Sequence, residues 1–355
     1  MANSSPIRYG RDTTLETPRY DDLWLPVYGG EVLAAFEEMT VAKNIVRSMT
    51  ISSGNTMKFP MIHKMNAQRH LAGTELLGTD TETSERIITL DERPIVAHFD
   101  LDDVDQAMSH FETRSEIAKQ AGRALARELD KNLLQLAVKA SRETSKGVFE
   151  GGGYQADPSV LNNGAAWTNS ALPATATTAW TKDSAGLLLH AIEDIVVAWD
   201  QRDVPQEERY CIVPTDCWHR LRNIGLPPVG QFTAGTSTTI GYNPFASGTL
   251  PQGVPSDADS SRAQALTYLG VNIVRSNFLP NGNDITTGET KYAGDFTNTR
   301  AICIQKQAVG LLTLMGVQTE TDRDVRRQTD FFMTKMLYGG GTLRPECAVE
   351  IAYSA

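Results

Sequence analysis

The longest regular pattern of apolar positions lies between residues 114 and 142. Thr113 and Glu116 just before it have the spacing of a capping box, so we expect a helix to begin near Arg114. No proline interrupts it, and at roughly 1.5 Å per residue the helix would be about 43 Å long. A stripe this thin predicts a beam along which other elements lie, not the centre of a globule. The apolar residues recur in steps of three or four, at Ile117, Ala121, Leu125, Leu129, Leu133, Leu136 and Ala140.

Four shorter helices are predicted on either side of the long one. Gly29 and Gly30 permit a tight turn, because glycine adopts backbone angles that other residues avoid. A short helix would follow this turn, with an apolar face formed by Val32, Leu33, Phe36 and Met39. The other three helices are predicted over residues 102–110, 182–201 and 214–223.

A long β-hairpin is predicted over residues 50–99. Its first strand alternates apolar and polar side chains around Met57, Phe59 and Met61. The returning strand, Glu85–Asp100, carries two alternating registers on either side of Pro94, and a polar segment with Gly73 and Gly78 would form the tip. About 12 residues per arm at roughly 3.3 Å each give a projection on the order of 40 Å. A two-stranded hairpin is marginally stable alone in water, so we expect this one to lie on another surface.

The remaining strands and loops complete an α+β pattern. Residues 327–353 are predicted to form two strands joined by a tight turn at the glycine triplet 339–341. Segments rich in glycine and small polar residues, 147–181 and 225–262, are predicted to be loops. Further strands are predicted over Arg209–Val213, Ala265–Arg275 and Arg300–Gln305.

The first 26 residues are polar and predict an extended arm without a core of its own. The segment lacks the apolar centre of a secretory signal. Elsewhere, no apolar run approaches the roughly 18 residues of a membrane span. Because neither the arm nor the hairpin can bury itself, we expect the partner of both to be another copy of the chain.

Composition narrows the class of protein. With 41% hydrophobic and 21% charged residues, the chain is typical of a folded protein. A formal net charge of −10 argues against a general nucleic-acid-binding surface, although a container that faces DNA from inside gains from not adhering to it. The cysteines form no CxxC pair, which predicts reduced thiols in a protein that folds in a cytoplasm: Cys211, Cys217, Cys303 and Cys347.

Candidate catalytic chemistry is sparse. His63 and His70 could ligate a metal, together with an acidic run formed by Asp100, Asp102, Asp103 and Asp105. We interpret the histidines as ordinary polar positions and the acids as favourable charges before a helix, because the run lacks the glycine and distal glutamate of a calcium loop. The glycine triplets at 151–153 and 339–341 lack the context of a phosphate loop. We therefore assign no catalytic residue, cofactor or metal ligand.

Clusters of charged side chains are the remaining candidates for a functional site. They are either solvated faces of one subunit or complementary contacts between subunits. The candidate contact residues lie in the arm, in the hairpin and towards the C-terminus: Arg8, Arg11, Arg19, Lys58, Lys64, Arg69, Glu75, Asp322, Arg323, Asp324, Arg326 and Arg327.

Four stretches stand in a fixed order along the chain: VYGGEVLAAF at 27–36, SSG and FP within 52–60, DLDDVDQAMSHFETRSE at 100–116, and GGTLRPE at 340–346. Together they resemble the major capsid proteins of short-tailed, T-seven-like podoviruses. The resemblance covers nearly the whole chain and is poorest from about 147 to 265.

This resemblance implies the Hong Kong 97-type phage capsid fold. Its parts would be an N-terminal arm (1–48), an extended loop formed by the hairpin (49–99), a peripheral domain with the long spine helix (100–145 and 313–355) and an axial domain (146–312). Some relatives of this fold cross-link lysine to asparagine with the help of a glutamate. We cannot match that trio of residues in this sequence.

The resemblance also implies partners and a place of action. Copies of the chain would form the hexamers and pentamers of an icosahedral virion shell, assembled in the host bacterial cytoplasm. A scaffolding protein would guide assembly, a portal protein would occupy one vertex, and a decoration protein is left open. The shell would enclose double-stranded DNA without sequence-specific binding and would not contact a membrane.

Two other functions remain open from the sequence alone. One is an encapsulin-like cellular nanocompartment, a shell of the same fold that encloses enzymes in place of DNA. The other is a metal-dependent hydrolase that uses His63, His70 and the acidic run from Asp100 to Asp105.

Overall fold

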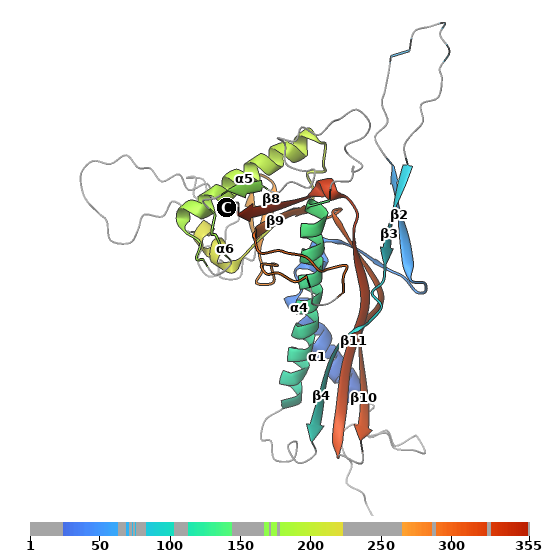
Figure 1. Ribbon diagram of the computed structural model, residues 1–355. Helices are drawn as coiled ribbons and strands as arrows, with labels where there is room; N and C mark the ends of the chain where they lie inside the picture. Colours follow the sequence, from blue (N-terminus) through green and yellow to red (C-terminus); the bar gives the residue numbers. More distant parts are fainter. Residues whose placement is uncertain are drawn as a thin grey trace, which may run out of the picture.

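The molecule is elongated and built along one long helix, α4 (Thr113–Ser141), as Figure 1 shows. The computed structural model describes residues 24–62, 69–70, 73, 75, 83–102, 113–143, 167–169, 172–175, 178–222, 265–285, 289–324 and 328–353. The other described helices are α1 (Trp24–Met39), α2 (Ala42–Ile45), α5 (Lys182–Gln201), α6 (Thr215–Arg222) and the short 3-10 helix η1 (Pro345–Cys347).

Helix α4 has two different halves. It begins at Thr113, within a residue of the predicted start. Its first half packs against α1, where Gly122 lets the backbone of Val32 come close. In the second half every residue from Asn132 to Val138 is buried, because strands and loops surround the helix on all sides. The prediction of a beam outside the globule is therefore wrong for this half, which passes through the main core.

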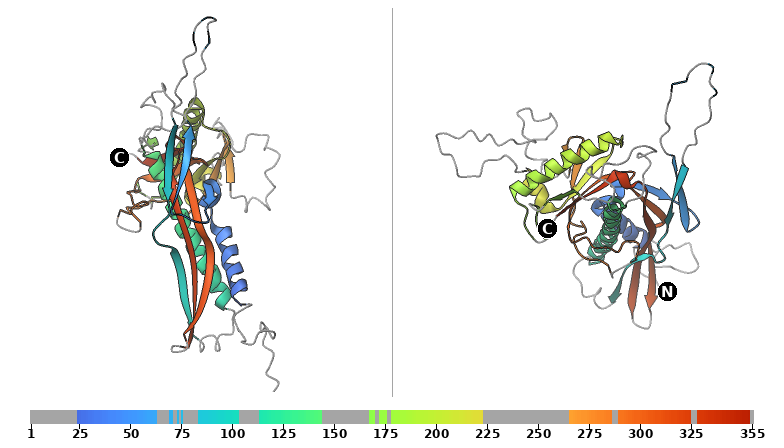
Figure 2. Two further views of the ribbon diagram at one scale, coloured as in Figure 1. Left: turned by 90° about the vertical axis from the view of Figure 1, so that its right-hand side faces the viewer. Right: turned by 45° about the horizontal axis from the view of Figure 1, so that its top comes forward.

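A four-stranded sheet, in the order β1-β10-β11-β4, lies along α4 and α1 (Figure 2). Phe332 of β11 packs with Val32 of α1 and Ala118 of α4, so both helices cover the same face. The long antiparallel pair β10–β11 extends away from the core and carries the distal part of this sheet. The bounds are β1 (Arg47–Thr50), β10 (Val309–Asp324), β11 (Thr329–Thr342) and β4 (Ile95–Asp102).

A six-stranded mixed sheet, in the order β5-β12-β9-β6-β8-β7, forms the second half of the molecule. All residues of its inner strand β9 are buried, and Trp199 of α5 and Trp218 of α6 are the largest buried side chains of the described core. Strand β12 follows β11 in sequence but pairs with β9 in this sheet. The bounds are β5 (Trp167–Asn169), β12 (Ala348–Tyr353), β9 (Thr299–Gln305), β6 (Arg209–Val213), β8 (Val271–Arg275) and β7 (Ala265–Tyr268).

The predicted hairpin is present as β2 (Thr56–Ile62) and β3 (Thr83–Thr89), which pair antiparallel and project from the body (Figure 1). Its base is anchored by an apolar cluster of Phe59, Ile88, Leu90, Leu312 and Leu343. The single returning strand predicted over Glu85–Asp100 is wrong. Strand β3 ends at Thr89, before Pro94. Strand β4 begins after Pro94 and pairs with β11 in another sheet. Most of the predicted tip lies outside the described residues.

The glycine triplet 339–341 is part of β11 and not the predicted turn. A Cβ on Gly339 would lie 2.3 Å from the carbonyl oxygen of Thr89, and one on Gly340 would lie 2.3 Å from Leu136 Cδ1. The triplet therefore lets β3 and α4 pack directly onto the backbone of β11. A run of glycines suits a turn and a close backbone approach equally well, so the sequence pattern does not distinguish the two.

Of the remaining predicted helices and strands, some are confirmed and others differ from the structure. The predicted helices at 182–201 and 214–223 and the strand Arg209–Val213 are confirmed. Gly29 and Gly30 lie inside α1, so the turn predicted there is wrong, and α1 begins within the predicted arm. Ala265–Arg275 forms two strands, with a turn at Leu269 and Gly270 that has positive φ angles. The loop 225–262 and most of the helix 102–110 lie outside the described residues; Asp102 itself ends β4.

We expect Gly339→Ala to lower the free energy of unfolding by about 1–3 kcal/mol, because its methyl group would collide with the backbone of β3. Gly316→Ala is the matched control, since a Cβ at that position of β10 meets nothing within 4 Å. Urea denaturation measures both. Equal stabilities of the two variants would contradict close packing as the reason for the triplet.

Candidate functional site

The charged candidate residues fall on separate surfaces of the molecule. Lys58 lies on the hairpin, where its Nζ is 2.6 Å from Glu85 Oε1; the two side chains are 63% and 51% exposed. A pair this exposed contributes at most about 1 kcal/mol to folding. Arg69 and Glu75 are exposed beyond β2. The candidates Arg8, Arg11, Arg19, Lys64, Arg326 and Arg327 lie outside the described residues.

The second surface is the distal end of β10 and β11, which we call the ribbon end (Asp322–Asp324 and Thr329–Asp330). Arg323 Nη1 lies 2.8 Å from Asp330 Oδ1, directly across the two strands. Asp322 is exposed and Asp324 is half-buried. The ribbon end and the hairpin point to opposite ends of the molecule (Figure 1). Among the described candidates, those of the hairpin and those of the ribbon end therefore do not meet within one chain.

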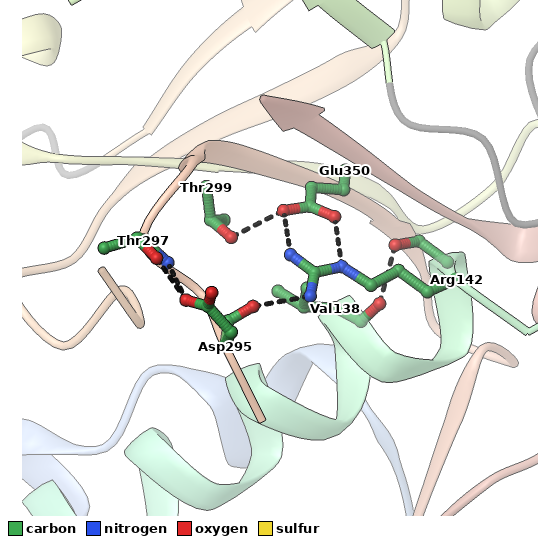
Figure 3. A network of polar contacts seen from close by, with 7 residues as sticks. Val138, Arg142, Asp295, Thr297, Thr299 and Glu350 are labelled. Carbon is green, nitrogen blue, oxygen red and sulfur yellow. Dashed lines mark hydrogen bonds and ion pairs between the residues drawn. The ribbon is translucent and has the colours of Figure 1, made fainter. Parts of the chain in front are cut away.

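Arg142, at the end of α4, forms a polar network that the sequence did not reveal (Figure 3). Its Nε and Nη2 each donate to Glu350 of β12 over 2.7 Å, and its Nη1 donates to the carbonyl oxygen of Asp295 over 2.6 Å. Thr299 of β9 donates its hydroxyl to the same carboxylate. The Glu350 side chain is 1% exposed, and its hydrogen bonds raise the pKa of Arg142. This two-pronged ion pair fastens α4 to the six-stranded sheet.

Asp130 of α4 fastens the N-terminal part of the described chain to this helix. Its buried carboxylate accepts hydrogen bonds from the hydroxyl of Thr40 at 2.7 Å and from the backbone N–H groups of Val41 and Ala42 at 2.8 and 3.2 Å. These groups stand at the start of α2, so Asp130 takes the place of a local N-cap residue. Burial raises the pKa of this carboxyl, and the hydrogen bonds oppose the shift without cancelling it.

A third polar joint holds the hairpin to the end of α4. Arg86 Nη1 of β3 lies 2.6 Å from Glu143 Oε1, and Thr342 of β11 donates its hydroxyl to Glu143 Oε2 over 3.0 Å. Neither partner of this joint was a candidate from the sequence, because the residues are far apart along the chain. An observed pairing of distant positions in related sequences would have been the signal to find them.

The chemistry that the sequence left open finds no assembled site in the described structure. Asp100 and Asp102 lie on β4, and the helix predicted to follow them lies mostly outside the described residues. His70 is exposed, while His63, Asp103 and Asp105 lie outside the described residues. Among the described residues no group of three or more histidine, cysteine, aspartate or glutamate side chains could hold a metal ion.

The four cysteines are free and buried. Burial raises the pKa of the thiols of Cys217, Cys303 and Cys347, which disfavours the reactive thiolate. No described helix is long and apolar enough to cross a membrane.

Comparison with known proteins gives a consistent result. A family model described as "Gp10A-like: Major capsid protein" matches residues 58–217 and 249–352. The chain is 28% identical to the major capsid protein of Escherichia phage T7 over 339 residues, which is 93% of this chain and 92% of that protein. It is also 28% identical to the minor capsid protein of the same phage, over 94% of this chain and 80% of that protein.

Solved structures agree with the sequence comparison. The capsid structure of the cyanophage P-SCSP1u superposes with a TM-score of 0.62 at 27% identity, over 99% of both chains. The mature capsid of bacteriophage PhiM1 superposes with a TM-score of 0.61 at 14% identity, over 89% of this chain and 87% of that chain. These neighbours confirm the Hong Kong 97-type capsid fold predicted from the sequence.

We expect Glu350→Gln to lower the free energy of unfolding by about 1–3 kcal/mol, because it removes the charge that balances Arg142 in a buried setting. Glu85→Gln makes the same chemical change in the exposed pair with Lys58 and should cost less than about 1 kcal/mol. Urea denaturation at neutral pH compares the two. If Glu350→Gln is as mild as its control, the Arg142 network does not fasten α4 to the sheet.

We expect Asp130→Asn to change how stability depends on pH. The folded-state pKa of Asp130 is raised above the ordinary value of 3.8, so folding favours its protonated form. Its contribution to stability is therefore full below about pH 3.8 and is lost as pH rises through the folded pKa. The difference in unfolding free energy between wild type and variant should grow in favour of wild type on acidification. Urea denaturation over a pH series measures this, and a constant difference would refute it.

Proposed function

The chain belongs to the Gp10A-like family of major capsid proteins, and from that premise we propose that its copies build the hexamers and pentamers of an icosahedral phage head around double-stranded DNA. The observation that carries this is the match of both the family model and a full-length capsid structure over most of the chain. As a capsid protein it is a structural protein of the virion, and we propose that it has no enzymatic activity.

The parts of the subunit support a division of labour. We assign an N-terminal arm to residues 1–48, an extended loop to 49–99, a peripheral domain to 100–145 and 313–355, and an axial domain to 146–312. The projecting hairpin supports the assignment of the extended loop. Strand pairing supports two changes to these limits. Strand β4 pairs with β11, which we assign to the peripheral domain, and β12 pairs with β9, which we assign to the axial domain.

Subunit contacts would involve the two charged surfaces. Lys58 and Arg69 are exposed basic residues of the hairpin, and Asp322 is an exposed acid of the ribbon end. Because these surfaces lie at opposite ends of the molecule, their charges can meet only between copies (Figure 1). Each such pair is weak, but a closed shell repeats it many times. The arm residues Arg8, Arg11 and Arg19 would add further contacts.

Other partners follow from the proposed role. A scaffolding protein would guide assembly in the host bacterial cytoplasm, a portal protein would occupy one vertex, and a decoration protein would be an additional partner on the shell. The net charge of −10 suits a wall that encloses DNA without binding its sequence. The family match favours this role over the encapsulin-like nanocompartment and the metal-dependent hydrolase.

Co-expression of the full chain with the scaffolding protein of its own phage should give closed shells in negative-stain electron micrographs. Deleting residues 1–23, which leaves α1 intact, should give a subunit that is folded by circular dichroism but forms far fewer shells. A full chain that stays monomeric beside its scaffold would contradict the proposed function. Normal shells from the truncated chain would contradict only the role of the arm.

A further inference from the structure

A loop that precedes β9 lies between α4 and the base of the hairpin. We call it the strap and define it as residues 282–285 and 289–297 of the described chain. The strap closes on itself, because Asp284 and Gly294 exchange backbone hydrogen bonds of 2.9 and 3.3 Å and Phe296 N–H donates to the carbonyl oxygen of Gly282. A closed loop of this kind can move as one unit.

Helix α4 holds the strap at four points on one face. Lys131 and Gln135 both reach Asp284 Oδ2, at 2.9 and 2.8 Å. Lys139 Nζ donates to the carbonyl oxygens of Lys291 and Ala293, at 2.8 and 3.1 Å. Arg142 donates to the carbonyl oxygen of Asp295. Residues spaced by four, four and three along a helix share a face, so these side chains form one polar row against the strap.

The opposite side of the strap grips the end of β3. The Tyr292 hydroxyl donates to Asp91 Oδ2 over 2.7 Å, and the Tyr292 hydroxyl oxygen accepts from the Gly340 N–H of β11 over 3.1 Å. Lys291 Nζ donates to the carbonyl oxygen of Thr89 over 2.7 Å and to Asp91 Oδ1 over 3.0 Å. Burial raises the pKa of Tyr292, so its hydroxyl stays protonated and able to donate.

These hydrogen bonds can fix the direction of the hairpin, which its apolar anchor cannot do. The cluster of Phe59, Ile88 and Leu90 with Leu312 and Leu343 holds the hairpin to the body. Burial of apolar surface is not directional and so tolerates tilting of the hairpin. Hydrogen bonds weaken steeply with angle, so bonds from a braced loop fix a direction. The half-buried Arg86–Glu143 pair is a further tether on β3.

We propose that Lys291 and Tyr292 are positioning residues, which set the direction of the β2–β3 hairpin and take their own position from α4 through the strap. This inference rests on the proposed function, because the hairpin is the part of the subunit that would reach a neighbouring copy. The strap continues into β9, so the hairpin, the spine helix and the six-stranded sheet share one connection.

Hydrogen exchange in the unassembled subunit tests the strap directly. Tyr292→Phe keeps the buried ring and removes the hydroxyl, which bonds to Asp91 and to Gly340. The backbone amides of β2 and β3 should then exchange about fivefold faster, because the bond to Asp91, which follows β3, is lost. Tyr268→Phe is the matched control, because it removes a hydroxyl that contacts Glu193 far from the hairpin. It should leave the exchange of β2 and β3 unchanged.

A second variant separates bracing from simple contact. Lys139→Met removes one of the four α4 side chains that hold the strap, yet Lys139 itself does not bond to the hairpin in the described structure. If the strap transmits position, this variant should also speed exchange of β2 and β3, relative to amides of β6 in the same protein. Unchanged hairpin exchange in Tyr292→Phe or in Lys139→Met would overturn the proposal.

Assembly gives the functional readout. Tyr292→Phe co-expressed with the scaffold should give fewer closed shells and a wider spread of diameters than wild type and Tyr268→Phe. Wild-type diameters from Tyr292→Phe would show that hairpin direction is set elsewhere. If the wild-type chain itself forms no shells, the proposed function fails, while the exchange measurements still decide whether the strap positions the hairpin.

Discussion

Helix α4 supplies two kinds of surface at once, and the rest of the subunit depends on this combination. Its buried second half gives the apolar surface on which strands of both sheets pack. The polar side chains of the same helix are bonded to other segments of the chain: Asp130 to α2, Lys139 to the strap and Arg142 to Glu350. A buried polar group is tolerated only when it is hydrogen-bonded, so the joints of Asp130 and Glu350 each satisfy a buried carboxylate and fix a neighbouring segment.

Close backbone contact is the second constraint on the centre of the molecule. At the triplet Gly339–Gly341 the backbone of β3 comes close to Gly339, and the side chain of Leu136 of α4 packs directly on Gly340. The base of the hairpin therefore sits against the strand that also borders the spine helix. A subunit built this way carries its projecting part on a closely packed centre, which suits the contact with another copy that we propose for the hairpin.

The sequence predicted those elements whose stability is local. Helix α5 and the strand β6 have periodic patterns and clear ends, and both were found at their observed bounds. Strand β10 was missed as an element, and β11 was interrupted at its glycines, because their conformation is decided by packing partners. The polar joints could not be predicted from the sequence for a related reason. Arg142 and Glu350 are 208 positions apart, and no local pattern around either residue indicates its partner.

The length of the hairpin explains why its direction needs more control than its attachment. Strand β2 has seven residues and spans about 23 Å at roughly 3.3 Å per residue. A tilt of about 10° at the base would move the far end of such a strand by about 4 Å, which exceeds the length of a hydrogen bond. Weak contacts between copies, such as exposed ion pairs, cannot correct a displacement of that size. The angle between the hairpin and the body must therefore be fixed at the base of the hairpin. The directional hydrogen bonds from Lys291 and Tyr292 lie at this base, at the end of β3.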